Sequence, residues 1–594
     1  MKDLQGITVL VLGLGASGLA MARWCVRCGA RVKVWDSRAQ PPQAQVLRQE
    51  LPQVELFCGE AMPSWVEGVQ RILKSPGLSP HDPRLQGLLA EAARRSVPVQ
   101  GELDLFARAL ADLKAERRYA PKVVAITGTN GKTTTTAMAA LLIERAGRRV
   151  ATAGNIGPTM LDTLGQALDL EPEVPTAVEP THTGPQAQDT APLAEAAESH
   201  EDVAAPDEDA QAVDAIHAAE RHIEETLEAV AALTGESEPV LPLVPPPPAP
   251  PVFEHLPEVW VLELSSFQLD GVQGFEPSAA TVLNLSQDHL DWHGSMDAYA
   301  AAKARIFGRE AVMVINRDDP RVEAMVPAPQ TVGKGRAAKV IERSVVRFGL
   351  DAPSHPGDFG LVVDAGMAWL VRALPSDEPH KATRRRKDEA DEELMLQRLM
   401  PADALRVRGR HNAANALAAL ALATAIGCPL APMLHGLREY AGEPHRVQHV
   451  ATVGGVDYVD DSKGTNVGAT VAALLGLGAD RLGRRLLVIL GGDGKGQDFT
   501  PLADPVSRHA RFVALIGRDA PALEAALAGT GVALARFDSL EAAVRGCAER
   551  AETGDVVLMS PACASLDMFR NYEHRAEVFV AAVRALAQER GEVV

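Results

Sequence analysis

Lys132 and Thr133 end a glycine-containing stretch, GTNGKT, whose residue types are suited to holding phosphate. The stretch follows the strand-like run KVVAIT and precedes a helical pattern, so exposed N–H groups and the helix dipole would favour an anion there. The lysine can reach terminal phosphates, and the threonine hydroxyl can ligate Mg²⁺. The spacing is shorter than in the common loop G-x-x-x-x-G-K-[ST], because Ile126 occupies the place of the first glycine. We therefore expect a nucleotide-binding loop of a variant type.

Two further strand-like runs end in side chains that could work beside this loop. Glu263 ends VWVLE, and Asp288-His289 follows ATVLNLS. Open α/β sheets bind ligands outside the carboxyl ends of their strands, so both side chains are expected near the phosphate. A carboxylate there would hold the metal ion of the nucleotide. Glu263 could instead face water from an edge strand, and His289 could be a locally satisfied loop histidine.

A second glycine-rich turn, GLGASG at 13–18, follows the run ITVLVL and opens another helical pattern. Asp36 lies about 20 residues further on, which by pattern alone predicts an NAD site. The pattern requires only a tight turn that admits a diphosphate, so a UDP-sugar would satisfy it as well. A nicotinamide dehydrogenase fused to a nucleotide hydrolase is one alternative, although no substrate domain with an obvious hydride-transfer acid or base is found.

These motifs are spread over 594 residues, a length that is too great for one core and suggests three or four domains. Strand and helix patterns alternate, so we predict an α/β protein of three domains. The first is Rossmann-like, and the second is a phosphate-loop ATPase domain. The third, with the runs LLVILG, FVALIG and DVVLM, is again Rossmann-like and should have a parallel sheet. The predicted ranges are 1–98, 99–442 and 443–594.

The composition is that of an ordinary globular protein, with 46% hydrophobic and 23% charged residues. No apolar run reaches the ~20 residues that span a bilayer, and the N-terminus lacks the basic region and cleavage site of a secretion signal. The six cysteines show no disulfide-framework spacing. Cys25 and Cys28 could form a redox pair, but they lie in an apolar helical pattern. We expect a cytoplasmic protein.

The net charge of −19 comes almost wholly from one segment. Residues 171–256 contain 19 Asp and Glu against one basic residue, Arg221, whereas the rest of the chain carries 59 acidic and 58 basic residues. The segment is rich in Ala, Pro and Glu and cannot bury enough apolar surface to offset its ordering entropy. We predict a mostly disordered insertion in the second domain, either an inert surface loop or a tether for basic partners. The charge gives no reason to expect nucleic acid binding.

Together the motifs resemble those of the Mur ligases, ATP-dependent enzymes of peptidoglycan precursor synthesis. The resemblance covers nearly the whole chain except 171–256. It rests on GTNGKT, GNIG (154–157), LELSSFQL (262–269), NLSQDHLD (284–291), AAKARIF (301–307), GRHNAANALAA (409–419) and PHR (444–446). The short glycine spacing of the phosphate loop is the form that this family uses.

Three C-terminal stretches are similar to the branch that adds D-glutamate: DDSKGTN (460–466), LGGDGKGQDF (490–499) and SPACASLDMFRNY (560–572). The His-Pro-Thr-Glu and Asp-x-Pro-Arg types of other branches do not stand at these positions. The resemblance implies that UDP-N-acetylmuramoyl-L-alanine attacks the γ-phosphate of ATP through its carboxylate. The amine of D-glutamate then attacks the acyl phosphate, and ADP and phosphate are released. We expect a monomer, with 171–256 as a possible tether to partners in wall synthesis.

The resemblance also implies binding residues. ATP would be held by Gly128, Thr129, Asn130, Gly131, Lys132, Thr133, Thr134, Asn412, Asn415, Arg446, Asp461 and Lys463. The UDP-sugar would be held by Gly15, Ala16, Ser17, Asp36, Ser37, Arg38, Ser75, Gly77, Asn155 and Ser265. D-Glutamate would be held by Thr465, Lys495, Ser565, the backbone of Leu566, and Tyr572, which stands where the family more often has phenylalanine.

Catalysis would depend on Lys132, Glu263, His289 and Lys303. The family uses two Mg²⁺ ions, for which Mn²⁺ can substitute, with Thr133 and Glu263 at one ion and His289 and Lys303 at the other. A cationic lysine beside Mg²⁺ is electrostatically unfavourable. The family resolves this by converting the lysine to a carbamate, which we carry for Lys303 as a hypothesis. The alternative is an ordinary lysine on a helix surface.

A folylpolyglutamate-type ligase is a further alternative, because it shares the GTNGKT domain and the activation of a carboxylate. Such an enzyme would need neither the N-terminal glycine-rich domain nor the stretch SPACASLD. In either ligase the residues for ATP and for the amino acid lie on different predicted domains, so we expect domain motion.

Overall fold

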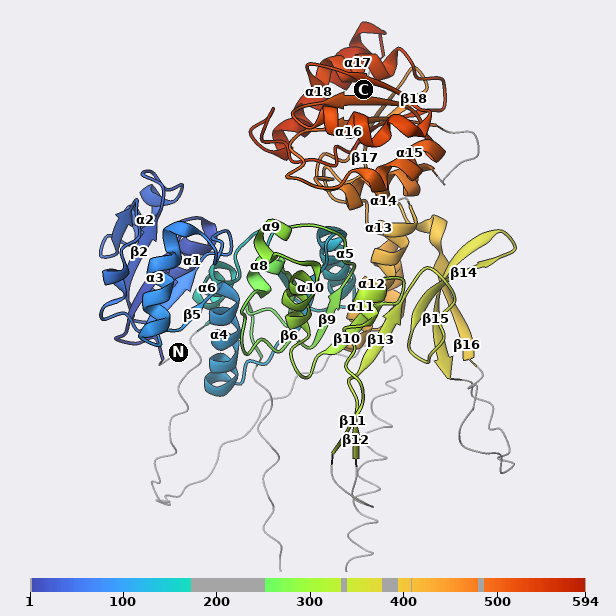
Figure 1. The fold of residues 1–594 in the computed structure, drawn as a ribbon. Helices are drawn as coiled ribbons and strands as arrows, with labels where there is room; N and C mark the ends of the chain where they lie inside the picture. Colours follow the sequence, from blue (N-terminus) through green and yellow to red (C-terminus); the bar gives the residue numbers. More distant parts are fainter. Residues whose placement is uncertain are drawn as a thin grey trace, which may run out of the picture. The chain divides into compact units, whose positions relative to one another are not determined.

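The structure is a computed structural model that describes residues 3–172, 252–332, 339–375, 394–407, 409–478 and 485–592. The insertion predicted at 171–256 lies almost entirely outside these ranges. The described residues form three large sheets that follow one another along the chain, and a small two-stranded sheet (Figure 1). None of the helices in these ranges is both long and apolar enough to cross a membrane.

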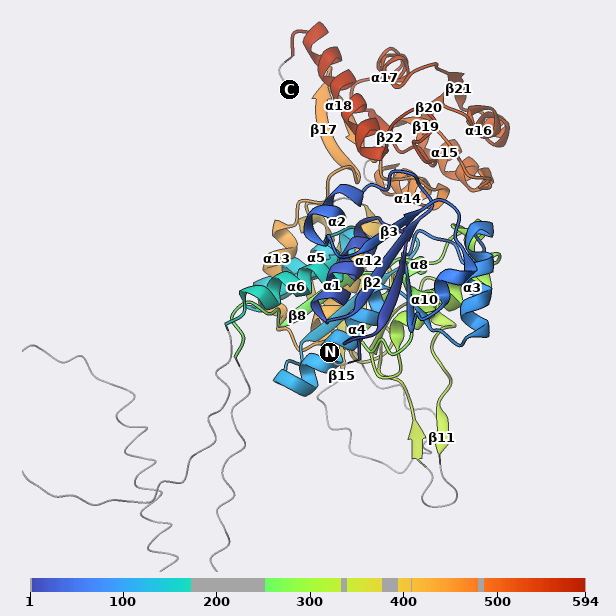
Figure 2. The same cartoon turned by 90° about the vertical axis from the view of Figure 1, so that its left-hand side faces the viewer.

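The N-terminal residues form a parallel sheet with helices on both faces. Its elements are β1 Thr8–Leu12, α1 Ala16–Arg27, β2 Arg31–Asp36, α2 Ala44–Glu50, β3 Glu55–Cys58, β4 Arg71–Lys74, α3 Pro83–Arg94 and β5 Val99–Gln100. The strand order is β3-β2-β1-β4-β5. Val9 and Val11 of β1 belong to the core that includes α1, whereas Leu10 and Leu12 belong to the core that includes α3 on the other face (Figure 2). The run ITVLVL is therefore apolar throughout because it is buried on both sides.

The two cysteines considered as a redox pair are packing residues. Cys25 is buried in α1, and Cys28 follows the end of that helix. Neither of them forms a disulfide, and the same holds for the other four cysteines. Burial raises the pKa of the Cys25 thiol to about 12, so it is protonated and unreactive at neutral pH.

The middle sheet has nine strands in the order β16-β15-β14-β13-β10-β9-β6-β8-β7, and β14, β15 and β16 pair antiparallel. The strands are β6 Lys122–Thr127, β7 Val150–Gly154, β8 Val259–Glu263, β9 Ala279–Val282, β10 Val312–Asn316, β13 Val345–Phe348, β14 Phe359–Asp364, β15 Met367–Pro375 and β16 Leu394–Pro401. The small sheet pairs β11 Gln330–Val332 with β12 Lys339–Ile341.

Helices cover this middle sheet on both faces. They are α4 Glu102–Arg117, α5 Lys132–Arg145, α6 Met160–Leu170, α8 Ser266–Leu269, α9 Leu290–His293, α10 Met296–Ala304, α11 Pro320–Glu323, α12 Arg410–Ala425 and α13 Leu430–Glu439. Val124 and Ile126 of β6 share a core with α5 and α12, and Val123 and Ala125 belong to the core of the opposite face. Helix α12 is buried along most of its length, which explains why its sequence is apolar nearly all round.

The C-terminal sheet has the order β17-β18-β22-β19-β20-β21, and only β17 pairs antiparallel within it. Its elements are β17 Gln448–Val453, β18 Val456–Asp460, α14 Val467–Gly478, β19 Leu486–Gly491, α15 Ala503–His509, β20 Ala510–Ile516, α16 Ala520–Leu527, β21 Ala533–Arg536, α17 Leu540–Ala548, β22 Val556–Met559 and α18 Tyr572–Glu589. Alternate residues of β19 again belong to two cores, one with α14 to α16 and one with α17 and α18.

The parallel pairing predicted from the runs LLVILG, FVALIG and DVVLM is confirmed, because these are β19, β20 and β22, and β19 pairs parallel with each of the other two. The antiparallel strands were not predicted. Gly454 and Gly455 turn β17 back onto β18 with φ of 61° and 75°. Ala365 and Gly366, with φ of 49° and 82°, likewise turn β14 back onto β15. Two-residue turns with both φ values positive match the twist of a hairpin. The pair Gly454-Gly455 was the sequence signal for the first of them.

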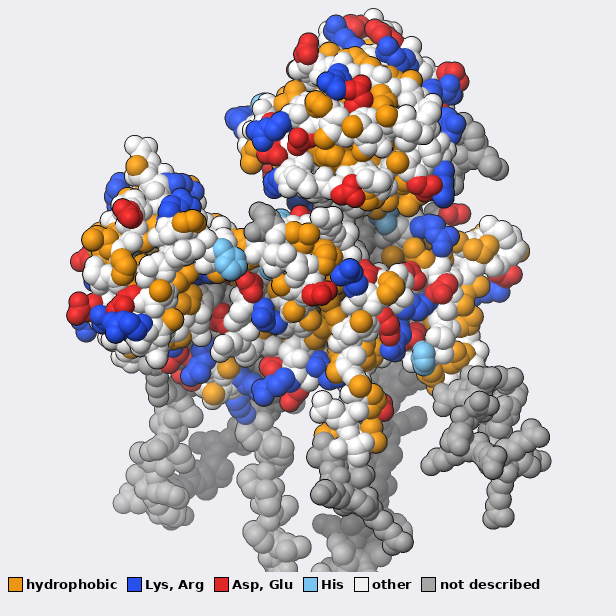
Figure 3. All heavy atoms as spheres, viewed as in Figure 1, with side chains coloured by type: hydrophobic (Ala, Val, Ile, Leu, Met, Phe, Trp, Pro, Cys, Tyr) orange, Lys and Arg blue, Asp and Glu red, His pale blue; other side chains and the backbone are white. Residues whose placement is uncertain are grey.

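Acidic and basic side chains are interspersed over the described surface seen in Figure 3. No broad patch of one sign covers that face of the described residues. This mixture agrees with the near balance of 59 acidic and 58 basic residues outside 171–256.

Candidate functional site

The phosphate loop leaves the carboxyl end of β6 and leads directly into α5. Gly128 and Gly131 have φ of 153° and 82°, conformations that residues with a side chain rarely adopt. A Cβ on Gly131 would lie 2.6 Å from Oδ1 of Asn415, so glycine permits α12 to approach the loop. Helix α5 begins at Lys132, and the N–H groups of its first turn have no partner within the helix. The loop therefore offers donors to an anion.

Asn284 and Tyr299, which were not predicted, hold this loop in place. Asn284 Oδ1 accepts from the N–H of Asn130 at 2.9 Å, and its Nδ2 donates to the carbonyl of the same residue at 3.1 Å. The hydroxyl of Tyr299 lies 3.2 Å from Oγ1 of Thr129. Asn284 stands within the stretch NLSQDHLD, and Tyr299 precedes Lys303 by one helical turn. Those two placements were the available signals.

Two lysine side chains converge on the loop. Lys132 Nζ donates to the carbonyls of Gly128 and Thr129, at 2.9 and 2.8 Å. Lys303 Nζ donates to Oγ1 of Thr127 and to the carbonyl of Gly128, at 3.0 and 2.9 Å. Lys303 is only 1% exposed, so the alternative of a lysine on a helix surface is wrong. Both ammonium groups thus meet at Gly128.

Glu263 ends β8, which lies between β6 and β7 in the sheet, so the alternative of an edge-strand glutamate is wrong as well. In register it pairs with Ile126 of β6 and Gly154 of β7. The side chain is 1% exposed, and its Oε1 accepts from Nδ2 of Asn155 at 2.9 Å. Its Oε2 is buried without a hydrogen bond. An unpartnered buried carboxylate oxygen is costly and is suited to a cation.

His289 lies between β9 and α9, at the same edge of the sheet. Its φ is 51°, and its ring packs edge-on against Phe267 with centroids 4.6 Å apart. Its Nε2 lies 3.5 Å from a carboxylate oxygen of Asp288. Across the described ranges, no group of three or more His, Cys, Asp and Glu side chains forms a metal cage. The predicted ligand sets differ from such a cage, because each of them includes a threonine or a lysine.

Burial and mutual repulsion lower the pKa values of the basic side chains around the loop. Burial lowers the pKa of Lys132 and, far more, of Lys303, and Lys132 lowers the pKa of Lys303 further. Burial lowers the pKa of Lys463, and Arg446 adds to the effect. Burial also lowers the pKa of His289, against the opposing charge of Asp288. A polyanion bound here would relieve this repulsion, so the site is electrostatically suited to a nucleotide triphosphate.

Residues from the segments that follow α13 and β18 lie at the same loop. Arg446 Nη2 donates to Oγ1 of Thr133 at 2.6 Å. Asp461 is buried, accepts from Oγ of Ser560 at 2.6 Å, and has its pKa raised by burial to about 7. Ser560 was not predicted, although it opens the stretch SPACAS.

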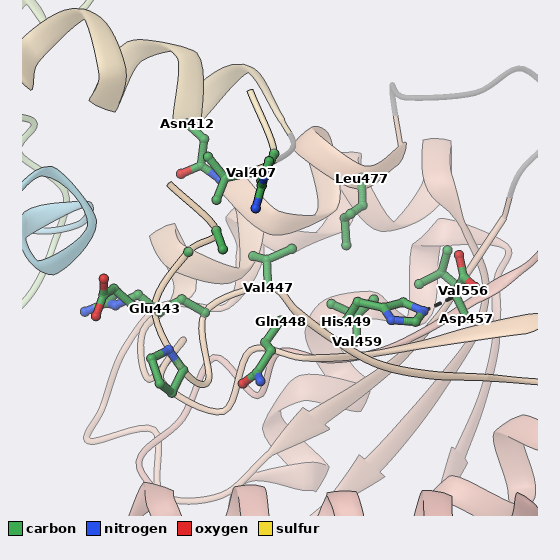
Figure 4. Close-up of a pocket in the computed structure, with 15 residues that line it drawn as sticks. Val407, Asn412, Glu443, Val447, Gln448, His449, Asp457, Val459, Leu477 and Val556 are labelled. Atoms are coloured by element: carbon green, nitrogen blue, oxygen red, sulfur yellow. Dashed lines mark ion pairs between the residues drawn. The ribbon is translucent and has the colours of Figure 1, made fainter. Parts of the chain in front are cut away.

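Eight of the twelve predicted ATP residues line one small cavity: Asn130, Gly131, Thr134, Asn412, Asn415, Arg446, Asp461 and Lys463. The other four belong to the phosphate loop itself. A larger pocket of about 640 Å³ adjoins it and shares Val407, Asn412 and Val447 with it (Figure 4). The far wall of this pocket carries an ion pair, with Nε2 of His449 3.5 Å from Oδ1 of Asp457.

The N-terminal glycine-rich turn differs from the phosphate loop in that its glycines have separate tasks. A Cβ on Gly18 would lie 1.8 Å from the carbonyl of Gly13, so Gly18 permits α1 to pack on the end of β1. A Cβ on Gly15 would meet nothing within 4 Å, so Gly15 leaves open space at the start of the helix. Ala16 and Ser17 form the first turn of α1 behind that space. The turn is closed by Ser75, whose Oγ donates to Gly13 at 3.1 Å.

The carboxylate of Asp36 accepts hydrogen bonds from within and beside this turn. One oxygen accepts from the N–H of Leu14 at 2.7 Å and from the guanidinium of Arg38 at 2.7 Å. The other accepts from the N–H and Nε of Arg38, at 2.9 and 2.8 Å. Burial opposes the charge, but these donors outweigh it and bring the pKa of Asp36 down to about 2. All of its acceptor sites are used, so none remains for the ribose hydroxyl that the NAD pattern requires.

The remaining residues predicted for the UDP-sugar lie around the facing loops. Ser37 follows β2, and Gly77 leaves space in which a Cβ would meet nothing within 4 Å. Asn155 is bonded to Glu263. Ser265 caps α8 and donates its hydroxyl hydrogen to Gln268 at 2.9 Å. The hydroxyl of Ser265 therefore serves its own helix.

The residues predicted for D-glutamate come from loops at one edge of the C-terminal sheet. Thr465, Lys495 and Ser565 follow β18, β19 and β22, which are neighbours in that sheet. Backbone bonds join these loops: Ala562 to Gly464 at 3.0 Å, and Asp493 with Ala564 in a β-bridge. Leu566 is 70% exposed beside them. Tyr572 begins α18, and its ring lies 5.1 Å from Nζ of Lys463.

Family models match three parts of the chain. A model described as "Mur ligase MurD-like, N-terminal domain" matches residues 7–101. "Mur ligase middle domain" matches 126–184 and 252–351, and "Mur ligase, glutamate ligase domain" matches 445–563. Together the matches cover more than half of the chain.

Curated relatives match over nearly their whole length. The UDP-N-acetylmuramoylalanine–D-glutamate ligase of Albidiferax ferrireducens is 52% identical, with 100% of this chain and 98% of the relative covered. That of Burkholderia mallei is 51% identical, with 99% of each covered. Among solved structures, the UDP-N-acetylmuramate-alanine ligase of Thermotoga maritima is similar with a TM-score of 0.49 at 16% identity, over 98% of this chain and 99% of that one.

Proposed function

The chain belongs to the Mur ligase family, and on that premise we propose that its phosphate loop activates the carboxylate of UDP-N-acetylmuramoyl-L-alanine for attack by D-glutamate. The enzyme is an ATP-dependent ligase that adds D-glutamate to this UDP-sugar in peptidoglycan synthesis. The observation that carries the assignment to the site is the meeting of Lys132, Lys303 and Arg446 at one loop, beside the buried carboxylate of Glu263.

The chemistry needs an environment that stabilises negative charge. A carboxylate oxygen of the substrate attacks the γ-phosphorus of ATP, and the bond from that phosphorus to the β,γ-bridging oxygen breaks. The substrate becomes an acyl phosphate, and ADP is the leaving group. The amine of D-glutamate then attacks the acyl carbon, and the carbon–oxygen bond to phosphate breaks. Lys132 lies over the loop and would neutralise the charge that spreads over the transferred phosphoryl group. Arg446 would reach the same group from the C-terminal residues.

Mg²⁺ fits the residues at this edge of the sheet. Thr133 and Glu263 would hold one ion, since Oε2 of Glu263 is buried without a hydrogen bond. His289 and Lys303 would hold a second ion. When bound, such ions would neutralise phosphate charge and orient the phosphates; Mn²⁺ would be expected to replace them.

A carbamate on Lys303 is supported by its surroundings. Burial and the charge of Lys132 both lower its pKa, which favours the uncharged amine that can react with carbon dioxide. The product would carry a negative charge among cations, which removes the repulsion between the two lysines. Intact-mass measurement of protein prepared without acid, followed by peptide mapping, would detect the added carboxylate on Lys303.

D-Glutamate would bind at the edge formed by the loops after β18, β19 and β22. Its two carboxylates need paired donors, and Lys495, Thr465, Ser565 and the N–H of Leu566 are supplied there by three loops that are bonded to one another. We also propose domain boundaries near residues 98 and 442; residue 442 falls between the middle-domain match, which ends at 351, and the match at 445–563, whereas 98 lies just inside the end of the match at 7–101.

The decisive test is phosphate release from ATP with UDP-N-acetylmuramoyl-L-alanine as acceptor and a series of amino acids. Release should require both the acceptor and D-glutamate, and L-glutamate should be at most a weak substitute. Release that is equal for D- and L-glutamate, or independent of the acceptor, would contradict the proposal. Calorimetry with NADH and with the UDP-sugar separates the dehydrogenase alternative, since only the UDP-sugar should bind.

A further inference from the structure

Glu102 is a buried carboxylate that has no part in the phosphoryl-transfer site. It is the first residue of α4 and is 3% exposed. Its Oε1 accepts from the N–H of Leu161 at 3.2 Å, and the N–H of Met160 and the hydroxyl of Ser17 are further polar groups beside the carboxylate that favour its charged form. Burial raises the pKa of Glu102, and these donors oppose the rise. A carboxylate is buried at this cost only where donors compensate for its lost hydration.

The polar neighbours of Glu102 belong to two helices that serve different ends of the substrate site. Ser17 lies in the first turn of α1, behind the open space at the glycine-rich turn. Met160 and Leu161 open α6, directly after the loop that carries Asn155. Helices α1, α4 and α6 pack against one another, as Figures 1 and 2 show. Glu102 therefore ties the glycine-rich turn to the segment that leads to Asn155.

Asn155 completes the connection to the phosphoryl-transfer site. Its Nδ2 donates to Glu263 at 2.9 Å, and its N–H donates to the carbonyl of the same glutamate at 2.8 Å. A chain of polar contacts and short backbone segments thus runs from Ser17 through Glu102 and Asn155 to Glu263. Its two ends are the places proposed for the diphosphate and for the reacting carboxylate.

Ion pairs between α1 and α6 surround this contact, but they are more exposed to solvent than Glu102 is. Arg23 on α1 pairs with Asp162 on α6 at 3.1 Å, and Arg27 pairs with Asp169 at 2.5 Å. Pairs as exposed as these contribute about 0 to 1 kcal/mol each. Met160 and Leu161 are buried together with Glu102, so water cannot take over its bonds.

We propose that Glu102 is a positioning residue for the UDP-sugar, which sets the separation between the diphosphate and carboxylate ends of one substrate molecule. The inference rests on the proposed function, in which both ends belong to UDP-N-acetylmuramoyl-L-alanine.

The test is steady-state kinetics of Glu102→Gln with each substrate varied in turn. The variant keeps the shape but turns an amide donor toward N–H groups. The KM for the UDP-sugar should rise about tenfold, with kcat within about threefold and the KM values for ATP and D-glutamate unchanged. Glu102→Asp, which keeps the charge, should rescue part of the KM and serves as the test if Glu102→Gln does not fold.

Asp104→Asn is the matched control. Asp104 is a second buried carboxylate in the same turn of α4, and it accepts from the N–H groups of Gly101 and Gln273, both at 2.8 Å. Its loss should lower Tm without moving the KM for the UDP-sugar. If Glu102→Gln raises all three KM values alike, or raises none, the positioning role is wrong.

Ser17→Ala in a double-mutant cycle tests the route through the hydroxyl. The KM of the double variant should be no higher than that of Glu102→Gln alone, because both changes remove one coupled contact. Additive effects would contradict this route. Calorimetry of the wild type with the UDP-sugar separates the two proposals: no binding at all overturns the proposed function, whereas equal binding by wild type and Glu102→Gln overturns only the positioning role.

Discussion

The chain contains two strand–glycine–helix turns that look alike in sequence but differ in what surrounds them. The turn at 13–18 has no basic side chain at the start of its helix, and the carboxylate of Asp36 accepts a hydrogen bond from the N–H of Leu14 in the turn itself. The turn at 128–133 has Lys132 in the first position of its helix, with Lys303, Arg446 and Glu263 brought to it from elsewhere. Both offer N–H groups to phosphate.

The difference indicates that a glycine turn alone can bind a phosphate group. Phosphoryl transfer also needs charged side chains that come from other segments of the chain. A diphosphate that is only held needs donors and open space, which Gly15 and the start of α1 provide. A phosphoryl group that is transferred needs its growing charge stabilised, which requires cations fixed in a poorly hydrated place. The two turns should therefore respond to substitution in different ways.

Lys132→Met should give the largest effect. It removes the cation that lies over the phosphate loop, so kcat for phosphate release should fall about 10³-fold or more, with the KM for the UDP-sugar nearly unchanged. Lys122→Met, on the exposed start of β6, is the control and should be near wild type. A loss confined to UDP-sugar binding would contradict the assignment of binding to the turn at 13–18 and of phosphoryl transfer to the turn at 128–133.

Lys303→Ala should lower activity about 10²- to 10³-fold, because it removes a buried amine at the loop and any carbamate that it carries. Small carboxylates added to the assay should restore part of the activity if a carbamate is lost, and should do nothing for Lys132→Met. Unchanged activity in Lys303→Ala would eliminate both the carbamate and the second metal site.

Gly15→Ala and Gly18→Ala should separate binding from folding within the first turn. A Cβ on Gly15 meets no atom within 4 Å, so Tm should hold while the KM for the UDP-sugar rises about tenfold, as the methyl group enters the space for the diphosphate. A Cβ on Gly18 would lie 1.8 Å from the carbonyl of Gly13, so unfolding should become easier by about 1–3 kcal/mol. Equal Tm values for the two variants would contradict this division.

Asp36→Asn should have the smallest effect, and that effect should vanish in acid. The folded-state pKa of Asp36 is about 2, below its ordinary value of 3.8, so its stabilisation is present above about pH 4 and is lost as the pH falls toward 2. The variant should lose about 1 kcal/mol at neutral pH, since Arg38 is half exposed and screened. Chemical denaturation should show the difference between variant and wild type disappearing between pH 4 and pH 2.

Much of the fold could be predicted from local patterns. Buried parallel strands such as ITVLVL and KVVAIT are marked by continuous apolar runs, and the rule that ligands bind at the carboxyl ends of strands correctly predicted Glu263 and His289 near the phosphate loop. The hairpins at Gly454-Gly455 and Ala365-Gly366 were not predicted, because the sequence analysis assigned no strands on either side of these turns. Two-residue turn chemistry, rather than the strand pattern, decided the direction there.

By itself the sequence determined the two glycine turns, the residues that follow each strand and the family to which they belong, because these are local spacings along one chain. Only the tertiary structure decided that Lys303 is buried at Gly128, that Oε2 of Glu263 is left without a donor, and that Asp36 has no acceptor site to spare. It also decided that Glu102 meets Ser17 and α6. Burial and hydrogen-bond partners depend on which distant segments meet, and no spacing along the chain encodes them.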